Sequence, residues 1–157
     1  MIKVGKIVNT HALKGEVRLL SNFDYKDRIF KPGFILHVGS GFQAEEIESY
    51  RKHKQFDMIK FKGIDYINDV LKYKGSIVYV DENDLVLGDD EILSSDFVLY
   101  TVYENDQMIG KIMEYRNDNG NCMIRVNDKF IPYNKDFISK IDKNEKKIYM
   151  HDIGVFL

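Results

Sequence analysis

The sequence predicts a mainly β protein: two small antiparallel β-barrels joined by a short linker, with one short helix in the N-terminal barrel. Short runs rich in Val, Ile, Phe and Tyr recur along the chain between Gly, Pro, Asn and Asp, which is typical of antiparallel strands and tight turns. An acidic segment at residues 81–91 divides these runs into two groups. The 157 residues, 44% of them hydrophobic, suit one large domain or two small ones that fold without metal or disulfide support.

Six strands are expected before the acidic segment, at residues 3–8, 16–20, 34–38, 43–50, 56–61 and 76–80. Short strands at this spacing, with turn signals at Lys31-Pro32-Gly33 and Gly39-Ser40-Gly41, indicate a small closed barrel. One helix is expected over residues 69–74, with Asn68 as its N-cap and Gly75 as its C-terminal stop.

The acidic segment is expected to contain the domain boundary. We expect an N-terminal barrel at 1–86, a linker at 87–95 and a second domain at 96–157. Strands are expected in the second domain at 97–104, 108–116, 122–126, 130–131 and 147–151. Turns rich in Asn and Asp at 117–120, 127–128 and 142–145 predict a meander.

The net charge of −2 is unevenly distributed. Residues 1–80 carry 14 Lys and Arg against 9 Asp and Glu, whereas residues 81–157 carry 9 against 16. A basic half suits phosphates and an acidic half suits a basic protein. Accidental unevenness between two small domains remains the alternative.

Signals for an enzyme or a metal site are weak. The single Cys122 excludes an intramolecular disulfide, and its apolar surroundings favour a buried, inert thiol. The four histidines are scattered without metal-ligand spacing, and Gly39-Ser40-Gly41 lacks the lysine and helix of a phosphate-binding loop. We therefore expect no catalytic residue, no metal and no cofactor.

No apolar run of signal-peptide or membrane-spanning length is found in the sequence. This pattern, together with the single cysteine, predicts a cytoplasmic protein without a membrane partner. A monomer is expected because no long apolar amphipathic surface stands out.

The loop between the first two expected strands is one candidate contact site. His11 could donate to a phosphate, with Lys14 and Arg18 supplying charge beside it. The alternative for His11 is a hydrogen bond within its own loop. Gly15 is interpreted mainly as a backbone requirement of the turn.

A second candidate is the basic run Arg51, Lys52, His53 and Lys54, which lies between aromatic residues. Three cations and a titratable ring could grip an RNA backbone. Basic residues at a hairpin tip are also common in a purely solvated turn, so both interpretations stay open.

Residues 3–20, with Thr10-His11 and the run Lys14-Gly15-Glu16-Val17, resemble the opening motif of the RimM family of ribosome maturation factors. Three further places match that family, namely residues 51–54, Phe61-Lys62-Gly63-Ile64 and Ile131-Pro132. The chain departs from the family at Ala12 and Leu99, where glycine is usual, and at Ile92-Leu93, where two aromatic residues are common.

The resemblance implies an N-terminal RimM barrel followed by a PRC-barrel domain, and a role without catalysis in assembly of the small (30S) ribosomal subunit. It implies binding to free small subunits through ribosomal protein number nineteen of the head, with support for folding and processing of 16S ribosomal RNA. The ribosome-facing residues would be His11, Lys14, Gly15, Arg18, Arg51, Lys52, His53 and Lys54. The residues toward the ribosomal protein would be Ile92, Leu93, Phe97 and Leu99, with packing between the domains as the alternative.

Two other functions remain open from the sequence. One is a regulatory barrel that binds single-stranded RNA. The other is a small enzyme that uses His11 or His53 as a base, which requires a deep pocket and an oriented carboxylate beside the histidine.

Overall fold

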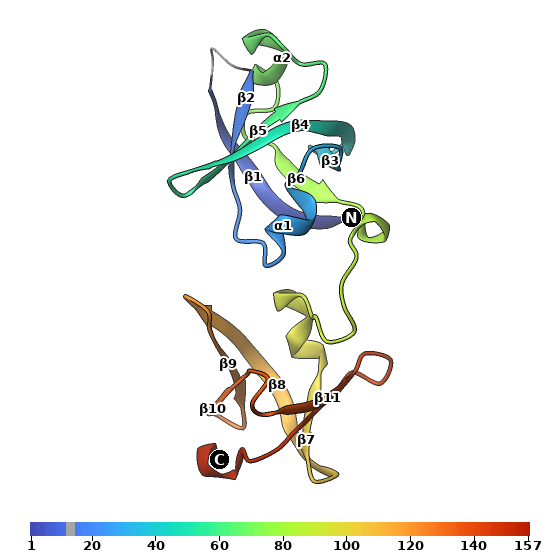
Figure 1. Cartoon of the computed structure of the whole chain (residues 1–157), viewed down its shortest axis with the longest axis vertical. Coiled ribbons are helices and arrows are strands. Elements are labelled where there is room, and N and C mark those ends of the chain that lie inside the picture. Colours follow the sequence, from blue (N-terminus) through green and yellow to red (C-terminus); the bar gives the residue numbers. More distant parts are fainter. Residues whose placement is uncertain (12–14) are drawn as a thin grey trace. The chain divides into compact units, whose positions relative to one another are not determined.

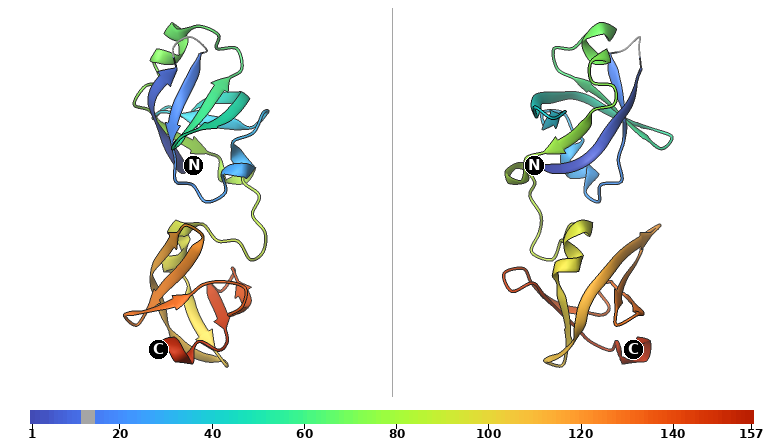
Figure 2. Two further views of the ribbon diagram at one scale, coloured as in Figure 1. Left: turned by 60° about the vertical axis from the view of Figure 1, so that its left-hand side comes forward. Right: turned by 180° about the vertical axis from the view of Figure 1, so that it is seen from behind.

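The computed structural model describes residues 1–11 and 15–157. The chain divides into two compact units, Met1–Val86 and Leu87–Leu157 (Figures 1 and 2). Each unit has its own six-stranded sheet and its own hydrophobic core. The predicted mainly β class with two β units is therefore confirmed. None of the helices in the described residues is long and apolar enough to cross a membrane.

The N-terminal unit is a closed barrel with strand order β1-β2-β5-β4-β3-β6, in which β6 pairs with β1. All of its strand pairs are antiparallel, and all six expected strands are present. Their bounds are β1 Ile2–His11, β2 Glu16–Leu20, β3 Ile35–Val38, β4 Gln43–His53, β5 Phe56–Phe61 and β6 Ile77–Val80.

Two short helices, α1 (Lys26–Ile29) and α2 (Ile67–Leu71), accompany the barrel. Only α2 was predicted, and its predicted start was wrong. The chain is still extended at Tyr66, so the helix begins at Ile67 and Asn68 lies inside it rather than capping it. The α1 helix was missed because four residues are too few to show a helical period.

Alternation along β5 separates the inside of the barrel from its outer surface. Asp57, Ile59 and Phe61 are fully buried, and Ile59 and Phe61 belong to the barrel core. Because successive side chains of a strand point to opposite faces, Phe56, Met58 and Lys60 point outward. Met58 is nevertheless 0% exposed, so neighbouring side chains must cover it on the outer surface.

The C-terminal unit contains a six-stranded sheet in the order β10-β9-β8-β7-β12-β11. The bounds are β7 Thr101–Glu104, β8 Gln107–Asp118, β9 Asn121–Val126, β10 Lys129–Pro132, β11 Ile138–Asp142 and β12 Lys147–Met150. The β7–β12 pair is parallel, unlike the antiparallel pairing expected throughout. Tight turns force neighbours to be antiparallel, but β7 and β12 are far apart in sequence, so no turn sets their relative direction.

Two-residue turns connect β7 to β8, β8 to β9 and β9 to β10. Their residues, Asn105-Asp106, Asn119-Gly120 and Asn127-Asp128, all have positive φ. Such backbone angles are those of the turns that match the twist of antiparallel strands, and they favour Asn, Asp and Gly.

Two expectations for the C-terminal unit were wrong. Residues 97–99 belong to a 3-10 helix, η3 (Ser94–Leu99), because a period of three buries both Phe97 and Tyr100 in the second core. The strand β11 was missed because a register irregularity between Ile138 and Lys140 interrupts its alternation. Short 3-10 helices also occur at η2 (Glu82–Asp84) and η4 (Gly154–Phe156).

The unit boundary changes the charge division. Residues 1–86 carry 14 Lys and Arg against 12 Asp and Glu, or +2, and residues 87–157 carry 9 against 13, or −4. The difference in charge is smaller than that between residues 1–80 and 81–157, because Asp81, Glu82 and Asp84 belong to the first unit.

Residues 87–95, expected as a linker, fall in the second unit, whose core includes Ile92.

Candidate nucleic-acid interface

Strand register places several of the predicted contact residues on one surface of the N-terminal barrel. His11 on β1 lies opposite Glu16 on β2. Arg18 on β2 and Arg51 on β4 both lie opposite Met58 on β5. Residues opposite each other in neighbouring strands share a face, so these side chains form a common surface. We call this surface the outer face; it includes His11, Glu16, Arg18, Arg51, Phe56 and Met58.

A bidentate ion pair crosses the outer face from β4 to β2. The Nε of Arg51 donates to Oε2 of Glu16 at 3.0 Å, and its Nη2 donates to Oε1 at 2.9 Å. The Glu16 side chain is 7% exposed, whereas that of Arg51 is 43% exposed. The hydrogen bonds to Glu16 raise the pKa of Arg51 above its ordinary value. Arg51 is therefore held by one edge of its guanidinium and open to solvent elsewhere.

His11 lies on the other side of the same carboxylate. Its Nδ1 is 3.7 Å from Oε1 of Glu16, too far for a good hydrogen bond, and no described residue accepts from or donates to that nitrogen. Glu16 thus lies between His11 and Arg51.

Arg18 is fixed against an aromatic ring rather than a carboxylate. Its guanidinium carbon lies 5.1 Å from the centroid of the Phe56 ring, which is cation–π geometry. The Nε of Arg18 is buried without a hydrogen-bond partner among the described residues. Arg18 and Arg51 flank Met58 from two sides, which accounts for the complete burial of this outward-pointing methionine.

The basic run does not form a single patch, because Lys52 points to the opposite face from Arg51. Lys52 Nζ lies 3.6 Å from Oδ1 of the fully buried Asp57. The same carboxylate accepts from Lys26 Nζ at 2.8 Å and from the hydroxyl of Tyr50 at 2.5 Å. Burial, followed by the hydrogen bond and charge of Asp57, raises the pKa of Tyr50. Lys52 therefore belongs to a polar cluster at the α1 side of the barrel.

The other two basic-run residues lie at the end of the β4–β5 hairpin, whose tip projects from the barrel (Figure 1). His53 pairs with Phe56, and the two-residue turn that follows starts with Lys54 at φ +55°. The side chains of His53 and Lys54 are exposed. A lysine in the left-handed region costs about 1 kcal/mol relative to glycine.

The first loop is only partly described. Gly15 has φ +67°, and a Cβ built there would lie 3.1 Å from the carbonyl oxygen of Ile64. Two independent constraints thus favour glycine at this position. The predicted contact residue Lys14, like Ala12, lies outside the described residues.

The four residues expected to face a ribosomal protein have different environments. Ile92 and Phe97 are buried in the second core, where Phe97 stacks on Tyr115 with ring centroids 4.1 Å apart. Leu93 is half-buried and Leu99 is 52% exposed. The burial of Ile92 and Phe97 supports a packing role within the C-terminal unit, which leaves Leu99 as the accessible member.

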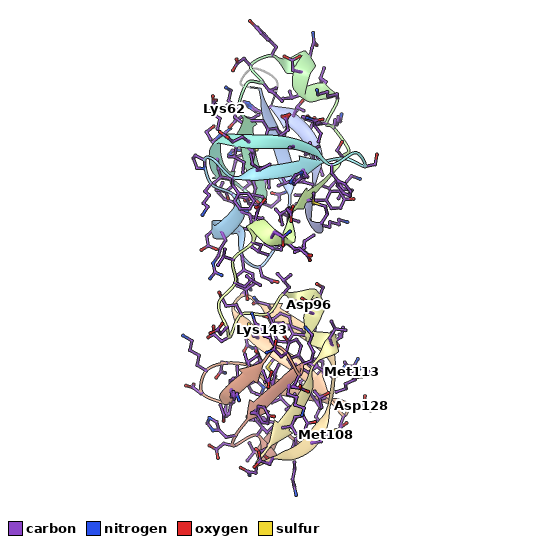
Figure 3. The ribbon with its side chains drawn as sticks, turned by 90° about the vertical axis from the view of Figure 1, so that its right-hand side faces the viewer. Lys62, Asp96, Met108, Met113, Asp128 and Lys143 are labelled. Atoms are coloured by element: carbon purple, nitrogen blue, oxygen red, sulfur yellow. The ribbon has the colours of Figure 1, made fainter. Side chains whose placement is uncertain are left out.

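The C-terminal unit also exposes two methionines on β8. Met108 and Met113 are 66% and 58% exposed, and Figure 3 labels both on this unit. Met113 lies at a register irregularity between Ile112 and Glu114, which turns it away from the regular alternation of the strand.

The enzyme alternative requires a deep pocket that contains His11 or His53 and an oriented carboxylate. One groove in the described residues contains neither His11 nor His53; its lining residues are Asp27, Arg28, Lys31, Phe34, Asp84 and Val86. His11 does have a carboxylate nearby, but that carboxylate is engaged by Arg51. Among the described residues, no group of three or more His, Cys, Asp or Glu could hold a metal ion.

Sequence reasoning missed Glu16, Phe56 and Met58 as members of the outer face. An isolated acidic residue and a strand aromatic carry no signal of their own, and Glu16 is 35 positions from Arg51. The one available signal was alternation, which places Glu16 and Arg18 on the same side of the second strand.

The family model and the sequence relatives of this chain indicate one family. The model of the RimM N-terminal domain matches residues 2–85. The chain is 41% identical to ribosome maturation factor RimM of Staphylococcus haemolyticus over 94% of this chain and 93% of that protein, and 37% identical to RimM of Exiguobacterium sibiricum over 94% and 92%. A solved structure of a 16S ribosomal RNA processing protein RimM from Pseudomonas aeruginosa aligns over 99% of both chains with 18% identity and a TM-score of 0.48. The coverage and identity of the sequence relatives show that this chain belongs to the RimM family.

Proposed function

We propose that this protein is a maturation factor for the small (30S) ribosomal subunit. It binds free small subunits, assists assembly of the subunit head and supports processing of 16S ribosomal RNA. The observation that carries this proposal is the 41% identity, over nearly the whole chain, to a protein named as a ribosome maturation factor.

The N-terminal barrel faces the ribosomal particle in this proposal. His11, Arg18 and Arg51 contribute from the outer face, and His53 and Lys54 contribute from the adjoining hairpin tip. Arg18, Arg51 and Lys54 are cationic, and Arg and Lys side chains are common donors to phosphate oxygens. Lys14 and Gly15 belong to the same predicted contact through the first loop, and Lys52 adds charge from the α1 side.

The C-terminal unit binds the basic ribosomal protein number nineteen of the subunit head. Its charge of −4 favours a basic partner. Leu99, with Leu93 beside the same 3-10 helix, supplies apolar contact, while Ile92 and Phe97 hold that helix on its own core.

The protein acts by binding, without a catalytic residue, metal or cofactor of its own. It works as a cytoplasmic monomer in which the boundary after Val86 separates the RNA-facing unit from the protein-facing unit.

Co-sedimentation with separated small subunits, large subunits and joined ribosomes, at low and high salt, tests this function. Binding confined to free small subunits supports the proposal, and the absence of binding to any particle refutes it. Lys54→Glu should weaken the binding and flatten its salt dependence. Lys74→Glu is the matched control, because it makes the same charge change on an exposed residue of the same unit, in the turn after α2.

One observation favours a second candidate, a regulatory barrel that binds single-stranded RNA. The guanidinium of Arg18 lies over the Phe56 ring, and proteins that bind single-stranded nucleic acid combine cationic and aromatic side chains in this way. Tight binding of short RNA oligomers, with no preference for ribosomal particles, would favour this candidate over a maturation factor.

A further inference from the structure

Glu16 is an unexpected residue on a surface proposed to bind phosphate, because its side chain is acidic. It is buried, it is acidic and it lies in the middle of the outer face between His11 and Arg51. A carboxylate there repels phosphate directly, and burying it is costly unless it is well paired. The burial of Glu16 therefore depends on its partner Arg51, which points to a role toward that residue.

The geometry of the ion pair indicates that role. Glu16 engages Nε and Nη2 of Arg51, which together form one edge of the planar guanidinium. No described residue bonds to Nη1, and the Arg51 side chain is 43% exposed. A guanidinium held along one edge presents its other edge in a fixed direction.

Arg18 supplies a second fixed donor on the same face. It is two residues from Glu16 along β2, and stacking on Phe56 limits the rotation of its long side chain. Arg18 and Arg51 are both register partners of Met58, so they lie on either side of one buried residue. Guanidinium groups that are already held by a carboxylate or an aromatic ring lose little side-chain entropy when an anion binds.

We infer that Glu16 is a positioning residue that orients Arg51, with Arg18 beside it, as a preformed clamp for the phosphodiester backbone of RNA. This inference rests on the proposed function, because it specifies how the outer face contacts the ribosomal particle. The opposite possibility is that Glu16 competes with phosphate for Arg51. The two roles predict effects of opposite sign.

The test measures binding of the full chain to a labelled single-stranded oligouridylate and to free small subunits. Removal of a negative charge ordinarily strengthens binding to RNA. Glu16→Ala is expected instead to weaken it by about 5-fold and to lower the slope of log affinity against log salt by about 0.7 on the oligomer, as expected for the loss of one phosphate contact. Glu82→Gln, which removes one exposed negative charge from the same unit, is the matched control and should bind as tightly as the unaltered protein or more tightly.

A double-mutant cycle separates positioning from general electrostatics. Arg51→Ala should match Glu16→Ala in affinity and salt slope, and the double variant should lose no more than either single variant. Stronger binding by Glu16→Ala, or additive losses in the double variant, would overturn the inference. Arg51→Lys keeps the charge but cannot form the bidentate pair, so it should also weaken binding and provides the test if Glu16→Ala does not fold.

The inference and the proposed function fail in different ways. If the unaltered protein binds no ribosomal particle, the proposed function fails. If it binds free small subunits and Glu16→Ala binds equally well or better, only the role of Glu16 fails.

Discussion

Asp57 is the residue whose substitution should most clearly reveal how the N-terminal barrel is held together. It is 0% exposed and accepts hydrogen bonds from Lys26 Nζ at 2.8 Å and from the Tyr50 hydroxyl at 2.5 Å. A hydrogen bond to a charged group contributes about 1.5–3 kcal/mol. In Asp57→Asn the amide oxygen keeps one of the two bonds, and Lys26, which is 27% exposed, recovers part of its hydration. We therefore expect the free energy of unfolding of the N-terminal unit to fall by about 2–3 kcal/mol.

The assay must resolve the two units, because each has its own core and the chain contains no tryptophan. Amide hydrogen exchange measured by NMR does so: the β5 amides report on the N-terminal unit and the β9 amides on the C-terminal unit. Exchange in β5 should accelerate by the factor that corresponds to the lost free energy, while exchange in β9 stays unchanged.

A double-mutant cycle isolates the Lys26–Asp57 pair from other effects of the substitution. Lys26→Met should cost less than Asp57→Asn, and the coupling free energy between the two should be about 1–2 kcal/mol. A loss below about 0.5 kcal/mol for Asp57→Asn, or simple additivity with Lys26→Met, would refute the reasoning that this buried carboxylate depends on its charged partner.

Three further predictions concern the same unit. Gly15→Ala should lower its free energy of unfolding by about 1–2 kcal/mol in chemical denaturation, because φ is +67° and the new Cβ would approach the Ile64 carbonyl oxygen; no loss would contradict the tight approach. Lys54→Gly should raise the free energy of unfolding by about 0.5–1 kcal/mol, because glycine adopts φ +55° without strain. The same substitution should weaken binding to small subunits, and unchanged binding would exclude a contact role for Lys54. Burial, followed by the charge of Glu45, raises the pKa of Tyr73 to about 12 from 10.0. The unfolded chain therefore releases this proton first, so this contribution to stability is complete below pH 10 and declines between pH 10 and about 12. Thermal unfolding over that range should show a weaker pH dependence in Tyr73→Phe, and an identical dependence would contradict the pKa shift.

Local sequence patterns were sufficient for most of the strands. The six N-terminal strands and the turns at Asn119-Gly120 and Asn127-Asp128 depend on side-chain alternation and backbone preference over a few residues, and both are visible in the sequence. The same patterns were ambiguous for residues 97–100, where a strand and a 3-10 helix both bury apolar side chains. Packing of Phe97 and Tyr100 on one side of the segment favours the 3-10 helix.

The candidate interface shows the limit of such patterns. Arg51 and Lys52 are neighbours in sequence, but alternation sends one to Glu16 on the outer face and the other to Asp57 on the α1 side. Conversely, Arg18 and Arg51 come from separate strands and meet beside Met58. Composition indicated a basic surface but could not show which cations are already paired within the chain.

By itself, the sequence determined the β class, the division into two units and, through its motifs, the family. These properties follow from short-range preferences and from residues read in order. Only the tertiary structure decided that Glu16 lies between His11 and Arg51, that Arg18 stacks on Phe56 and that Ile92 and Phe97 are core residues. The physical reason is strand register: a shift of one residue in the pairing of β2, β5 and β4 would move every one of these outer-face side chains to the opposite face of the sheet.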